Sequence, residues 1–412
     1  MPAAERRRAL ITGYGAVSPF GCGVAALWRG LLEGAVALAP IPELNPERAA
    51  AGDGSSANKG GLVPAFDGER ELGAERARRL DRATQFALAA TLEALATARL
   101  DLALVEPAKV GVILGTTLGG MLVGEEYRRA KRAGRRFDAR QLLHFPYYAV
   151  ANRLARELGV RGPVVSPSIA CASGTQAVGM ALDYIRSGQG DVFIVGGAET
   201  ACDFVVTGFN CLRATTRETV RPFDERRDGL LLGEGAAVLV VEAEEHARAR
   251  GAAVDLEVAG TGLAGDAVHM TAPARDGAGA ARAMRAALAD AGVRPQEVDF
   301  ISAHGTGTVY NDAMEAQAIG AVFGEAAAQI PVNGIKGSIG HSLGAAGSFE
   351  AILCARVLAE GCIPPTAGCE RLDPACSLDL VRGAARPRDV RVALSTSSAF
   401  AGNNAAIVLR RL

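Results

Sequence analysis

The sequence lacks the features that mark several large classes of protein. No apolar run reaches the roughly 18 residues that a helix needs to cross a bilayer, so we expect no membrane span. The 44 lysines and arginines are matched by 45 aspartates and glutamates, which gives a net charge of −1. Because nucleic acid is bound through an excess of positive charge, it is not an expected partner. Arginines at positions 6–8 precede a segment interrupted by Gly13 and Gly15, which predicts a strand and a turn rather than a secretory signal.

Cysteine is too sparse for a fold that depends on disulfides. The eight cysteines are scattered along the chain, and no two of them form a CxxC pair. This spacing is typical neither of a zinc site nor of a disulfide framework. We therefore expect a reduced, cytoplasmic protein that holds no metal, in which most thiols pack as small apolar residues.

Apolar residues are abundant, at 49%, and they occur in short continuous runs. Runs that do not alternate with polar residues are typical of strands covered on both faces. We predict strands at 9–11, 110–114, 192–195, 237–241, 300–302 and 405–409. Helices are predicted between them, at 81–98, 172–187, 279–291, 314–323 and 345–359. This alternation indicates an α/β fold, with a length that suits about two to four domains or two fused halves.

A weak internal repeat favours two similar halves. A strand that leads into a glycine turn occurs at 10–15 and again at 258–262. A helix that starts with small residues occurs at 171–174 and again at 344–347. We place the boundary near residues 250–254, which divides the chain into halves at 1–252 and 253–412.

The first candidate for chemistry is Cys171, within Ser-Pro-Ser-Ile-Ala-Cys-Ala-Ser-Gly at 166–174. An apolar segment ends at this cysteine, and small residues open a helix after it. The positive end of a helix dipole lowers the pKa of a thiol and favours thiolate. This context predicts a nucleophile, whereas an arbitrary cysteine is ordinarily a small buried apolar residue.

Two histidines lie in glycine-rich loops. His304 follows a predicted strand and precedes Gly-Thr-Gly-Thr, in which the hydroxyls of Thr306 and Thr308 suit a polar arm of a substrate. His341 follows Lys336 by five residues and precedes a helix of very small residues. One such histidine alone is more often structural. Two of them with a cysteine and a lysine suit a reaction that forms and stabilises an enolate.

Glu350 lies on the helix that follows His341, where it is placed to orient Lys336 or a histidine. A cysteine protease, by contrast, pairs its cysteine with one histidine as base and an Asn or Asp that orients it.

In these motifs and their order the chain resembles the β-ketoacyl-acyl-carrier-protein synthases, the condensing enzymes of the thiolase superfamily. The resemblance extends from Ile-Thr-Gly at 11–13 to Asn-Asn at 403–404. It includes Gly-Gly-Ala-Glu at 196–199, Arg-Pro-Phe-Asp at 221–224 and Gly-Glu-Gly at 233–235. It implies a thiolase-like α/β fold, with two βαβαβαββ halves in a five-layered αβαβα arrangement. The family works as a homodimer, and pairing with a chain-length factor is the alternative.

The resemblance implies a decarboxylative Claisen condensation. Cys171 matches the nucleophile that takes an acyl chain from a carrier-protein thioester. His304 and His341 match the residues that bind the thioester oxygen of malonyl-carrier protein and promote its decarboxylation. The product is a 3-oxoacyl thioester two carbons longer. Lys336 and Glu350 match a supporting charged pair.

Further roles follow from the same resemblance. The backbone N–H groups of Cys171 and Phe400 match the oxyanion hole of the acyl-transfer step. Thr306 and Thr308 match contacts to the phosphopantetheine arm of the acyl carrier protein, and Phe209 is placed at the acyl pocket. No cofactor is implied beyond that carrier-bound arm.

Carrier proteins are acidic, so exposed arginines are the candidate docking residues. The segment at 127–140 is rich in arginine and is either a solvated helix face or part of a docking patch. The docking candidates are Arg78, Arg79, Arg135, Arg136 and Arg213.

The loop near the C-terminus departs from the family pattern Asn-Ser-Phe-Gly-Phe-Gly-Gly-Thr-Asn. Here it is Thr-Ser-Ser-Ala-Phe-Ala-Gly-Asn-Asn, at 396–404. Ala399 and Ala401 replace glycines beside the gating Phe400, which restricts the backbone, and Ser398 replaces a phenylalanine. These changes leave specialised polyketide or polyene synthesis open beside fatty-acid synthesis.

Three alternatives use the same fold. A non-catalytic chain-length-factor partner lacks the nucleophile, which this chain has. A thiolase acting on coenzyme A esters uses a second cysteine, and none occurs here in a matching motif. An acyltransferase or cyclase stays open because of the altered loop.

Overall fold

The computed structural model describes residues 6–41, 44, 59–63 and 65–412, and all candidate site residues lie within these ranges. Each half of the chain contributes a sheet. The first contains β1 (Ala9–Ser18), β8 (Gly235–Ala243), β7 (Val192–Glu199), β5 (Val110–Gly115) and β6 (Val164–Val165), in that spatial order. The second contains β9 (Leu256–Gly265), β16 (Asn403–Arg411), β15 (Val392–Ala399), β10 (Phe300–Ser302), β11 (Pro331–Asn333) and β13 (Asp379–Leu380).

The two sheets share one pattern of pairing. In the first sheet β1–β8 and β8–β7 are antiparallel, whereas β7–β5 and β5–β6 are parallel. In the second, β9–β16 and β16–β15 are antiparallel, and β15–β10 and β10–β11 are parallel. A short antiparallel contact, Ala9 with Val258 and Leu10 with Glu257, joins the sheets at β1 and β9. The prediction of two similar halves is therefore confirmed.

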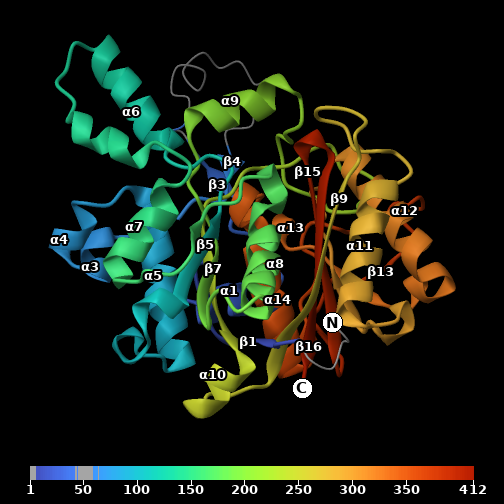
Figure 1. Ribbon diagram of the computed structural model, residues 1–412. Helices are drawn as coiled ribbons and strands as arrows, with labels where there is room; N and C mark the ends of the chain where they lie inside the picture. Colours follow the sequence, from blue (N-terminus) through green and yellow to red (C-terminus); the bar gives the residue numbers. More distant parts are fainter. Residues whose placement is uncertain (1–5, 42–43, 45–58, 64) are drawn as a thin grey trace.

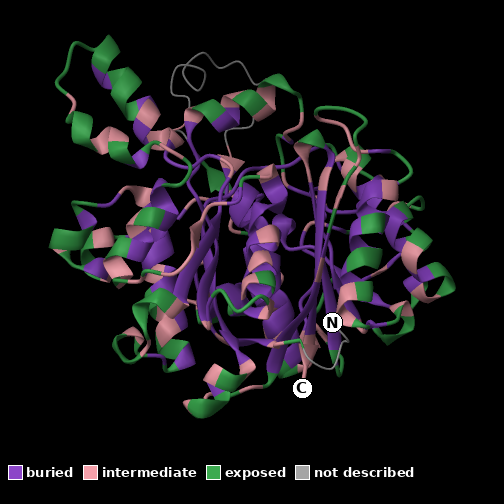
Figure 2. Ribbon diagram, in the orientation of Figure 1, coloured by how far each residue is buried: buried purple, intermediate pink, exposed green. Residues whose placement is uncertain are grey.

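The fold has five layers, in which three layers of helices alternate with the two sheets (Figure 1). Helices α8 (Ser173–Arg186) and α14 (Ala346–Glu360) lie in the central layer and contact both sheets. One outer layer holds α5 (Arg82–Ala98) and α7 (Ala149–Leu158), and the other holds α11 (Ala278–Ala291) and α12 (Val309–Phe323). Figure 2 shows strands and central helices almost wholly buried, and outer helices exposed on one face. The continuous apolar runs thus mark strands covered on both sides.

Smaller elements connect and flank these layers. The helices are α1 (Val24–Leu32), α3 (Gly68–Leu72), α4 (Ala74–Ala77), α6 (Met121–Arg132), α9 (Asp203–Cys211), α10 (Glu244–Ala249) and α13 (Lys336–Ile339). The strands are β2 (Gly21–Cys22), β3 (Ala39–Pro40), β4 (Lys59–Gly60), β12 (Cys362–Ile363) and β14 (Arg386–Pro387).

Glycines in the first strand of each half allow an outer helix to approach closely. A Cβ atom on Gly13 would lie 2.2 Å from the carbonyl oxygen of Ala94 in α5. A Cβ on Gly262 would lie 2.1 Å from the carbonyl oxygen of Ala283 in α11. The predictions of a glycine turn at 10–15 and at 258–262 were wrong. β1 continues to Ser18 and β9 continues to Gly265, because these glycines serve packing against a helix and not a turn.

Every predicted strand and helix is present, with differences at the ends. The helix predicted to begin at residue 314 begins at Val309, directly after Thr308, and the strand predicted at 192–195 continues to Glu199. The first difference places the start of α12 immediately after the His304 loop.

Candidate active site

Cys171, His304 and His341 lie together in one pocket of about 290 Å³. They come from three separate places in the chain. Cys171 lies between β6 and α8, His304 follows β10, and His341 follows α13. Four predicted substrate-binding residues and one docking residue also line this pocket: Thr306, Thr308, Phe209, Phe400 and Arg213.

Cys171 sits in a short 3-10 turn that leads into α8. Ala170, directly before it, has φ of 53°, which is a strained conformation for a residue with a Cβ atom. The hydroxyl of Ser173 stabilises this turn, since it donates to the carbonyl of Ala170 at 2.6 Å and accepts from the N–H of Ile169 at 2.9 Å. The turn directs the thiol into the pocket, where Cys171 is only 6% exposed.

The environment of Cys171 corrects one expectation. Burial raises the pKa of its thiol to about 12, and the positive charge of Lys336 opposes this rise without overcoming it. We expected the helix dipole to favour thiolate, but desolvation of the charged form is the larger effect in a closed pocket. Cys171 is therefore a neutral thiol before substrate binds.

The ring of His304 is held by contacts to its backbone and to Nδ1. The carboxylate of Glu315 accepts the N–H groups of His304 and Gly305 at 2.7 and 2.9 Å. The ammonium group of Lys336 lies 3.2 Å from Nδ1 of His304 and also donates to the His304 carbonyl oxygen. Because an ammonium group only donates, Nδ1 accepts and Nε2 carries the ring proton.

His341 has the same tautomer for a different reason. The backbone N–H of Leu343 donates to Nδ1 of His341 at 3.2 Å, so Nε2 carries the proton here too. Leu343 has φ of 48°, in the left-handed region. The N–H of His341 donates to the carbonyl of Leu231 at 2.7 Å, which fixes the loop against the first half.

Both imidazoles are neutral near pH 7. Burial and then the charge of Lys336 hold the pKa of His304 well below its ordinary value, and the same two causes act on His341. The ring centroids are 5.2 Å apart, with the planes at 82°. Two neutral rings with protonated Nε2 atoms therefore lie in one pocket, and each ring offers one N–H donor.

A buried chain of polar groups supports this pair. Lys336, on α13, forms an ion pair with Glu350 on α14, and both side chains are almost fully buried. Burial raises the pKa of Glu350 to about 7, and the adjacent ammonium opposes that rise. Glu350 also accepts from Ser397 at 3.3 Å, and Ser397 shares a hydrogen bond of 2.7 Å with Thr175 on α8. This series of polar contacts therefore links the histidine loops to α8, the helix that follows Cys171.

Comparisons with known proteins identify this arrangement. Residues 6–247 match the model of the beta-ketoacyl synthase N-terminal domain, and residues 256–370 match that of the C-terminal domain. The chain belongs to the beta-ketoacyl synthase family. The domain boundary placed near residues 250–254 falls between the two matched segments and stays a prediction.

The relatives are similar over their whole length. The chain is 37% identical over 418 residues to the 3-oxoacyl-[acyl-carrier-protein] synthase 2 of Staphylococcus aureus (strain COL), with 99% of each covered. It is 39% identical to the putative polyketide beta-ketoacyl synthase 1 of Streptomyces halstedii, with 98% of each covered.

Solved structures of ketosynthases share the thiolase-like fold. The ishigamide ketosynthase/chain length factor is 38% identical, with a TM-score of 0.92 and coverage of 99% of this chain and 100% of that one. A type II polyketide ketosynthase in complex with its acyl-carrier protein is 30% identical, with a TM-score of 0.90 and the same coverage. The five-layered α/β fold implied by the sequence is thereby confirmed.

One wall of the synthase pocket is built by the loop after His304. The hydroxyls of Thr306 and Thr308 are 2.8 Å apart, and Thr306 also lies 3.3 Å from the carboxylate of Asp312. The buried guanidinium of Arg227 donates to the carbonyl oxygens of Thr308 and Val309, at 3.3 and 3.2 Å. The wall is therefore fixed from both sides, as the prediction of a substrate arm at these threonines requires.

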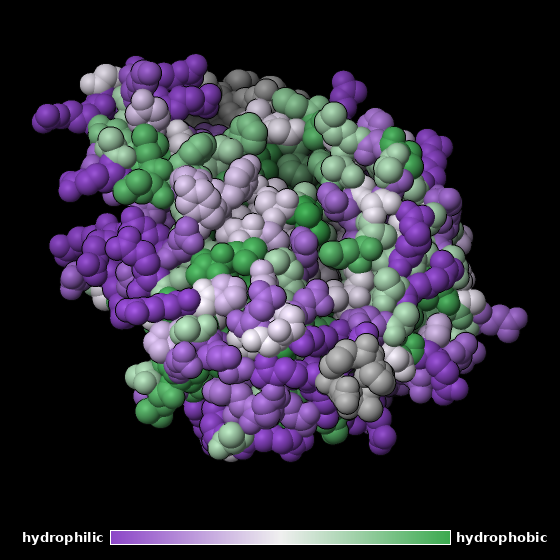
Figure 3. Space-filling model, in the orientation of Figure 1, coloured by the Kyte–Doolittle hydropathy of each residue, from purple (hydrophilic) through white to green (hydrophobic). Residues whose placement is uncertain are grey.

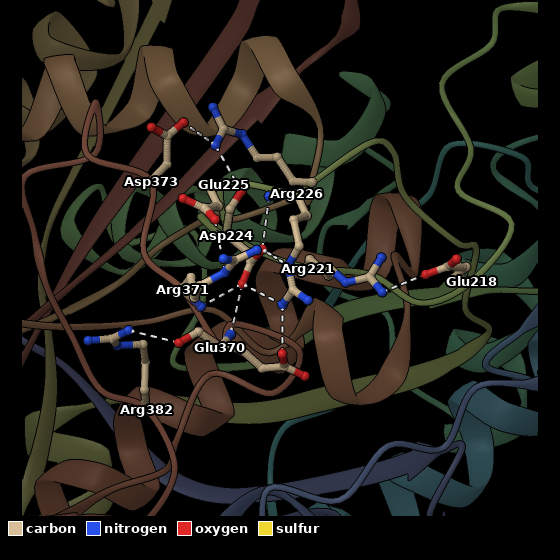
Figure 4. A network of polar contacts seen from close by, with 10 residues as sticks. Glu218, Arg221, Asp224, Glu225, Arg226, Glu370, Arg371, Asp373 and Arg382 are labelled. Atoms are coloured by element: carbon tan, nitrogen blue, oxygen red, sulfur yellow. Dashed lines mark hydrogen bonds and ion pairs between the residues drawn. The ribbon is translucent and has the colours of Figure 1, made fainter.

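The segment that carries Arg227 is fastened in turn to the loop at 370–373 (Figure 4). The carboxylate of Asp224 is fully buried and accepts from Arg226 and from the N–H groups of Glu370 and Arg371, both at 2.8 Å. Burial raises the pKa of this carboxyl, but these hydrogen bonds together lower it further, to a net value below its ordinary one. The Arg-Pro-Phe-Asp motif thus has a structural role, in bracing the pocket wall.

Phe400 and Phe209 form the opposite wall, with their rings stacked at a centroid distance of 5.4 Å. Ser398, at the position of the family phenylalanine, lines the pocket and donates to the side-chain oxygen of Asn404 at 2.8 Å. Ala401 has φ of 63° and ψ of 13°, so the residue after Phe400 adopts a left-handed conformation that suits the glycine of the family pattern. Ala399 is extended and has no such strain.

Replacing Ala401 with glycine tests this strain. Relief of the left-handed conformation, about 1–2 kcal/mol, exceeds the loss from the greater freedom of unfolded glycine, about 0.5–1 kcal/mol. We expect the free energy of unfolding in urea to rise by up to about 1 kcal/mol, because the exposed alanine makes few other contacts. Hydrogen exchange of the segment at 399–402 is expected to become faster. A large loss of stability would show that the methyl group has a packing role.

The predicted docking arginines are not gathered in one place. Arg213 lines the pocket, with φ of 53° after α9. Arg78 and Arg79 are exposed and lie 3.6 Å from Glu69 and 3.3 Å from Glu75. Arg135 and Arg136 are exposed in the loop after α6, where strongly hydrophilic side chains gather at the upper left of Figure 3. Their role in docking stays a prediction.

Sequence reasoning missed three buried carboxylates around the pocket. Glu315 and Asp312 hold the His304 loop, on α12, which begins earlier than predicted. Glu199 accepts from two loops near Cys171. For Glu199, the available signal was the Gly-Gly-Ala-Glu motif at 196–199, since an acidic residue in an apolar strand is expected to have partners.

Three further observations concern metal ligands, membrane helices and cysteines. Among the described residues there is no group of three or more His, Cys, Asp or Glu that could hold a metal ion. No helix in the described part of the chain is long and apolar enough to span a membrane. All eight cysteines are free thiols.

Proposed function

We propose that this chain is a condensing enzyme that joins an acyl group on Cys171 to malonyl-acyl-carrier protein, with loss of carbon dioxide. The observation that carries the proposal is the pair of neutral histidines, His304 and His341, with both Nδ1 atoms occupied as acceptors in the pocket of Cys171. Two relatives have names that agree with this reaction. One is named a 3-oxoacyl-[acyl-carrier-protein] synthase, and the other is named a putative polyketide beta-ketoacyl synthase.

The first half-reaction is acyl transfer. The sulfur of Cys171 attacks the carbonyl of the acyl thioester, the bond to the phosphopantetheine sulfur breaks, and the thiol proton ends on the departing phosphopantetheine. The N–H groups of Cys171 and Phe400 receive the oxyanion of this step. Because Cys171 starts as a thiol, the step needs proton transfer and not only approach of a thiolate.

The second half-reaction is decarboxylation and condensation. Nε2–H of His304 and of His341 bind the thioester oxygen of the malonyl group, so carbon dioxide leaves as negative charge moves onto that oxygen. The resulting enolate carbon attacks the acyl carbonyl on Cys171, and the Cys171 sulfur departs and recovers a proton. Thr306 and Thr308 bind the phosphopantetheine arm. The pocket excludes water, which protects the enolate from protonation.

Intact mass spectrometry tests the proposal. The purified protein is incubated with a panel of acyl-carrier proteins and then with malonyl-carrier protein. We expect the mass of an acyl group on Cys171, followed by its discharge as a product two carbons longer. The chains that load would distinguish fatty-acid from polyketide substrates. Loading without discharge would contradict condensation and favour an acyltransferase or cyclase.

The proposal includes the assembly and its location. We propose a cytoplasmic dimer, either of two copies or of this chain with a chain-length factor, as in the structures named for such pairs. Light scattering on the purified chain separates the two. A mass of twice 42.4 kDa supports the homodimer, and a monomer that dimerises only with a thiolase-fold partner supports the heterodimer.

A further inference from the structure

Glu199 is a fully buried carboxylate close to the site, with no part in the steps above. It is the last residue of β7, and β7 runs parallel to β5, so Glu199 lies beside the turn that follows β5. This turn contributes three donors to one carboxylate. They are the hydroxyl of Thr116 at 3.1 Å, the N–H of Thr117, and the N–H of Leu118 at 3.3 Å.

The same carboxylate also reaches the loop of His341. The N–H of Gly344 donates to Glu199 at 3.2 Å. Only glycine allows this approach, because a Cβ atom on Gly344 would lie 2.6 Å from the Glu199 oxygen and 2.6 Å from the nitrogen of Thr117. The Leu343 N–H that fixes Nδ1 of His341 is the preceding peptide group. Glu199 is therefore one residue away from the hydrogen bond that sets the tautomer of His341.

The nucleophile segment is part of the same junction. A Cβ atom on Gly115 would lie 2.5 Å from the carbonyl of Ser173, two residues after Cys171, and the Ser173 hydroxyl lies 3.5 Å from the Thr116 carbonyl. One buried carboxylate thus connects the turn after β5, which packs on the Cys171 helix, with the loop that carries His341.

Glu199 also acts on Cys171 through its charge. Burial raises the pKa of Glu199 to about 7, while its four hydrogen bonds oppose the rise, so the group is ionised above that pH. Its negative charge raises the pKa of the Cys171 thiol, as does that of Glu350, whereas the charge of Lys336 lowers it. Two other titratable groups in the pocket, His304 and His341, are neutral in this range. Arg213, Asp228 and Tyr310 also line the pocket.

We propose that Glu199 is a positioning residue of the condensing site: its buried carboxylate ties the loop that carries His341 to the turn beside Cys171, and so places one negative charge at the junction of the two. This inference rests on the proposed function for its effect on condensation, but its effect on the thiol does not depend on any carrier protein.

The test is the pH profile of Cys171 alkylation by iodoacetamide, followed by intact mass. Glu199→Gln removes the charge and keeps the size. We expect its profile to shift to lower pH by about half a unit or more. Glu199→Asp keeps the charge and is expected to stay near the wild-type profile. An unchanged profile for Glu199→Gln would overturn the electrostatic part of the proposal.

Glu234→Gln is the matched control. Glu234 is also a buried carboxylate, with the N–H groups of Val63 and Ala201 and the guanidinium of Arg82 as partners. The charges that shift the pKa of the Cys171 thiol most are those of Lys336, Glu199 and Glu350, and Glu234 is not one of them. We expect it to leave the alkylation profile unchanged. A shift of the same size in this control would show a general structural effect and would overturn the proposal.

Kinetics test the effect on His341. We expect Glu199→Gln to lower kcat for condensation by about tenfold or more, with KM for malonyl-carrier protein within about twofold, because the pantetheine wall is untouched. A change in KM alone would contradict a role in positioning His341. If wild type alkylates normally but condenses nothing, the proposed function fails while the effect on the thiol is still measured.

Discussion

Cys171→Ala is expected to abolish acyl loading, with a fall of at least about a thousandfold in condensation, because no other thiol lines the pocket in the described part of the chain. The thiol is the only sulfur among the residues that line this pocket. The free energy of unfolding is expected to change by no more than about 1 kcal/mol, since only one buried atom is lost. Intact mass and urea unfolding measure the two effects on the same sample.

Cys202→Ala provides the control for loss of a thiol. Cys202 is buried in the same apolar cluster as Cys171, but it does not line the pocket. Its alanine variant is expected to load an acyl chain at the wild-type rate. Acyl loading of Cys171→Ala, at any residue, would contradict the assignment of the nucleophile.

His304→Ala and His341→Ala are expected to separate the two half-reactions. Each variant removes one Nε2–H donor from the oxyanion of decarboxylation, which costs about a hundredfold to a thousandfold in rate. Acylation of Cys171 uses backbone donors instead, so it is expected to stay within about tenfold of wild type. Single-turnover experiments, with the acyl enzyme formed first and malonyl-carrier protein added second, measure each step.

The double variant and the pH dependence refine this prediction. If both histidines act on one oxyanion, the double variant is expected to be less impaired than the product of the two single effects, since the donors act as a unit. Because the pKa of each ring is held well below its ordinary value, both stay neutral as pH falls through 6.5.

Equal loss of acylation and condensation in the variants His304→Ala and His341→Ala would contradict separate roles for the two half-reactions.

Much of the fold could be predicted because it depends on local patterns. Continuous apolar runs marked all six predicted strands, and the repeated glycines at 13 and 262 reflect the same contact between a strand and an outer helix in each half. The ends of elements were less accurate. The start of α12 at Val309 depends on contacts between residues far apart in the chain. Arg227 donates to the carbonyl of Thr308, and Asp312 accepts the N–H of Phe223.

The chemistry of the site could likewise be predicted only in part from the sequence. The residue types at Cys171, which lies among small residues, and at His304 and His341, which each adjoin a glycine, were sufficient to indicate an enolate reaction. The protonation states were not, and the expected thiolate at Cys171 was wrong. Burial by residues from both halves sets the pKa of each group, and a pattern along one segment does not contain the position of Lys336 next to His304.

The sequence alone is sufficient to tell which reactive groups are present and which segments form strands, because apolar periodicity and glycine placement act over a few residues. Which of these groups meet, and in what protonation state, follows from the packed fold. Nδ1 of His304 and of His341 is occupied by a donor, and Cys171 is a neutral thiol. Glu199 joins the turn at 116–118 to the loop at Gly344, which lies 145 residues from Glu199 in the sequence. These facts depend on desolvation and on hydrogen bonds across the two halves, which exist only once the halves have packed together.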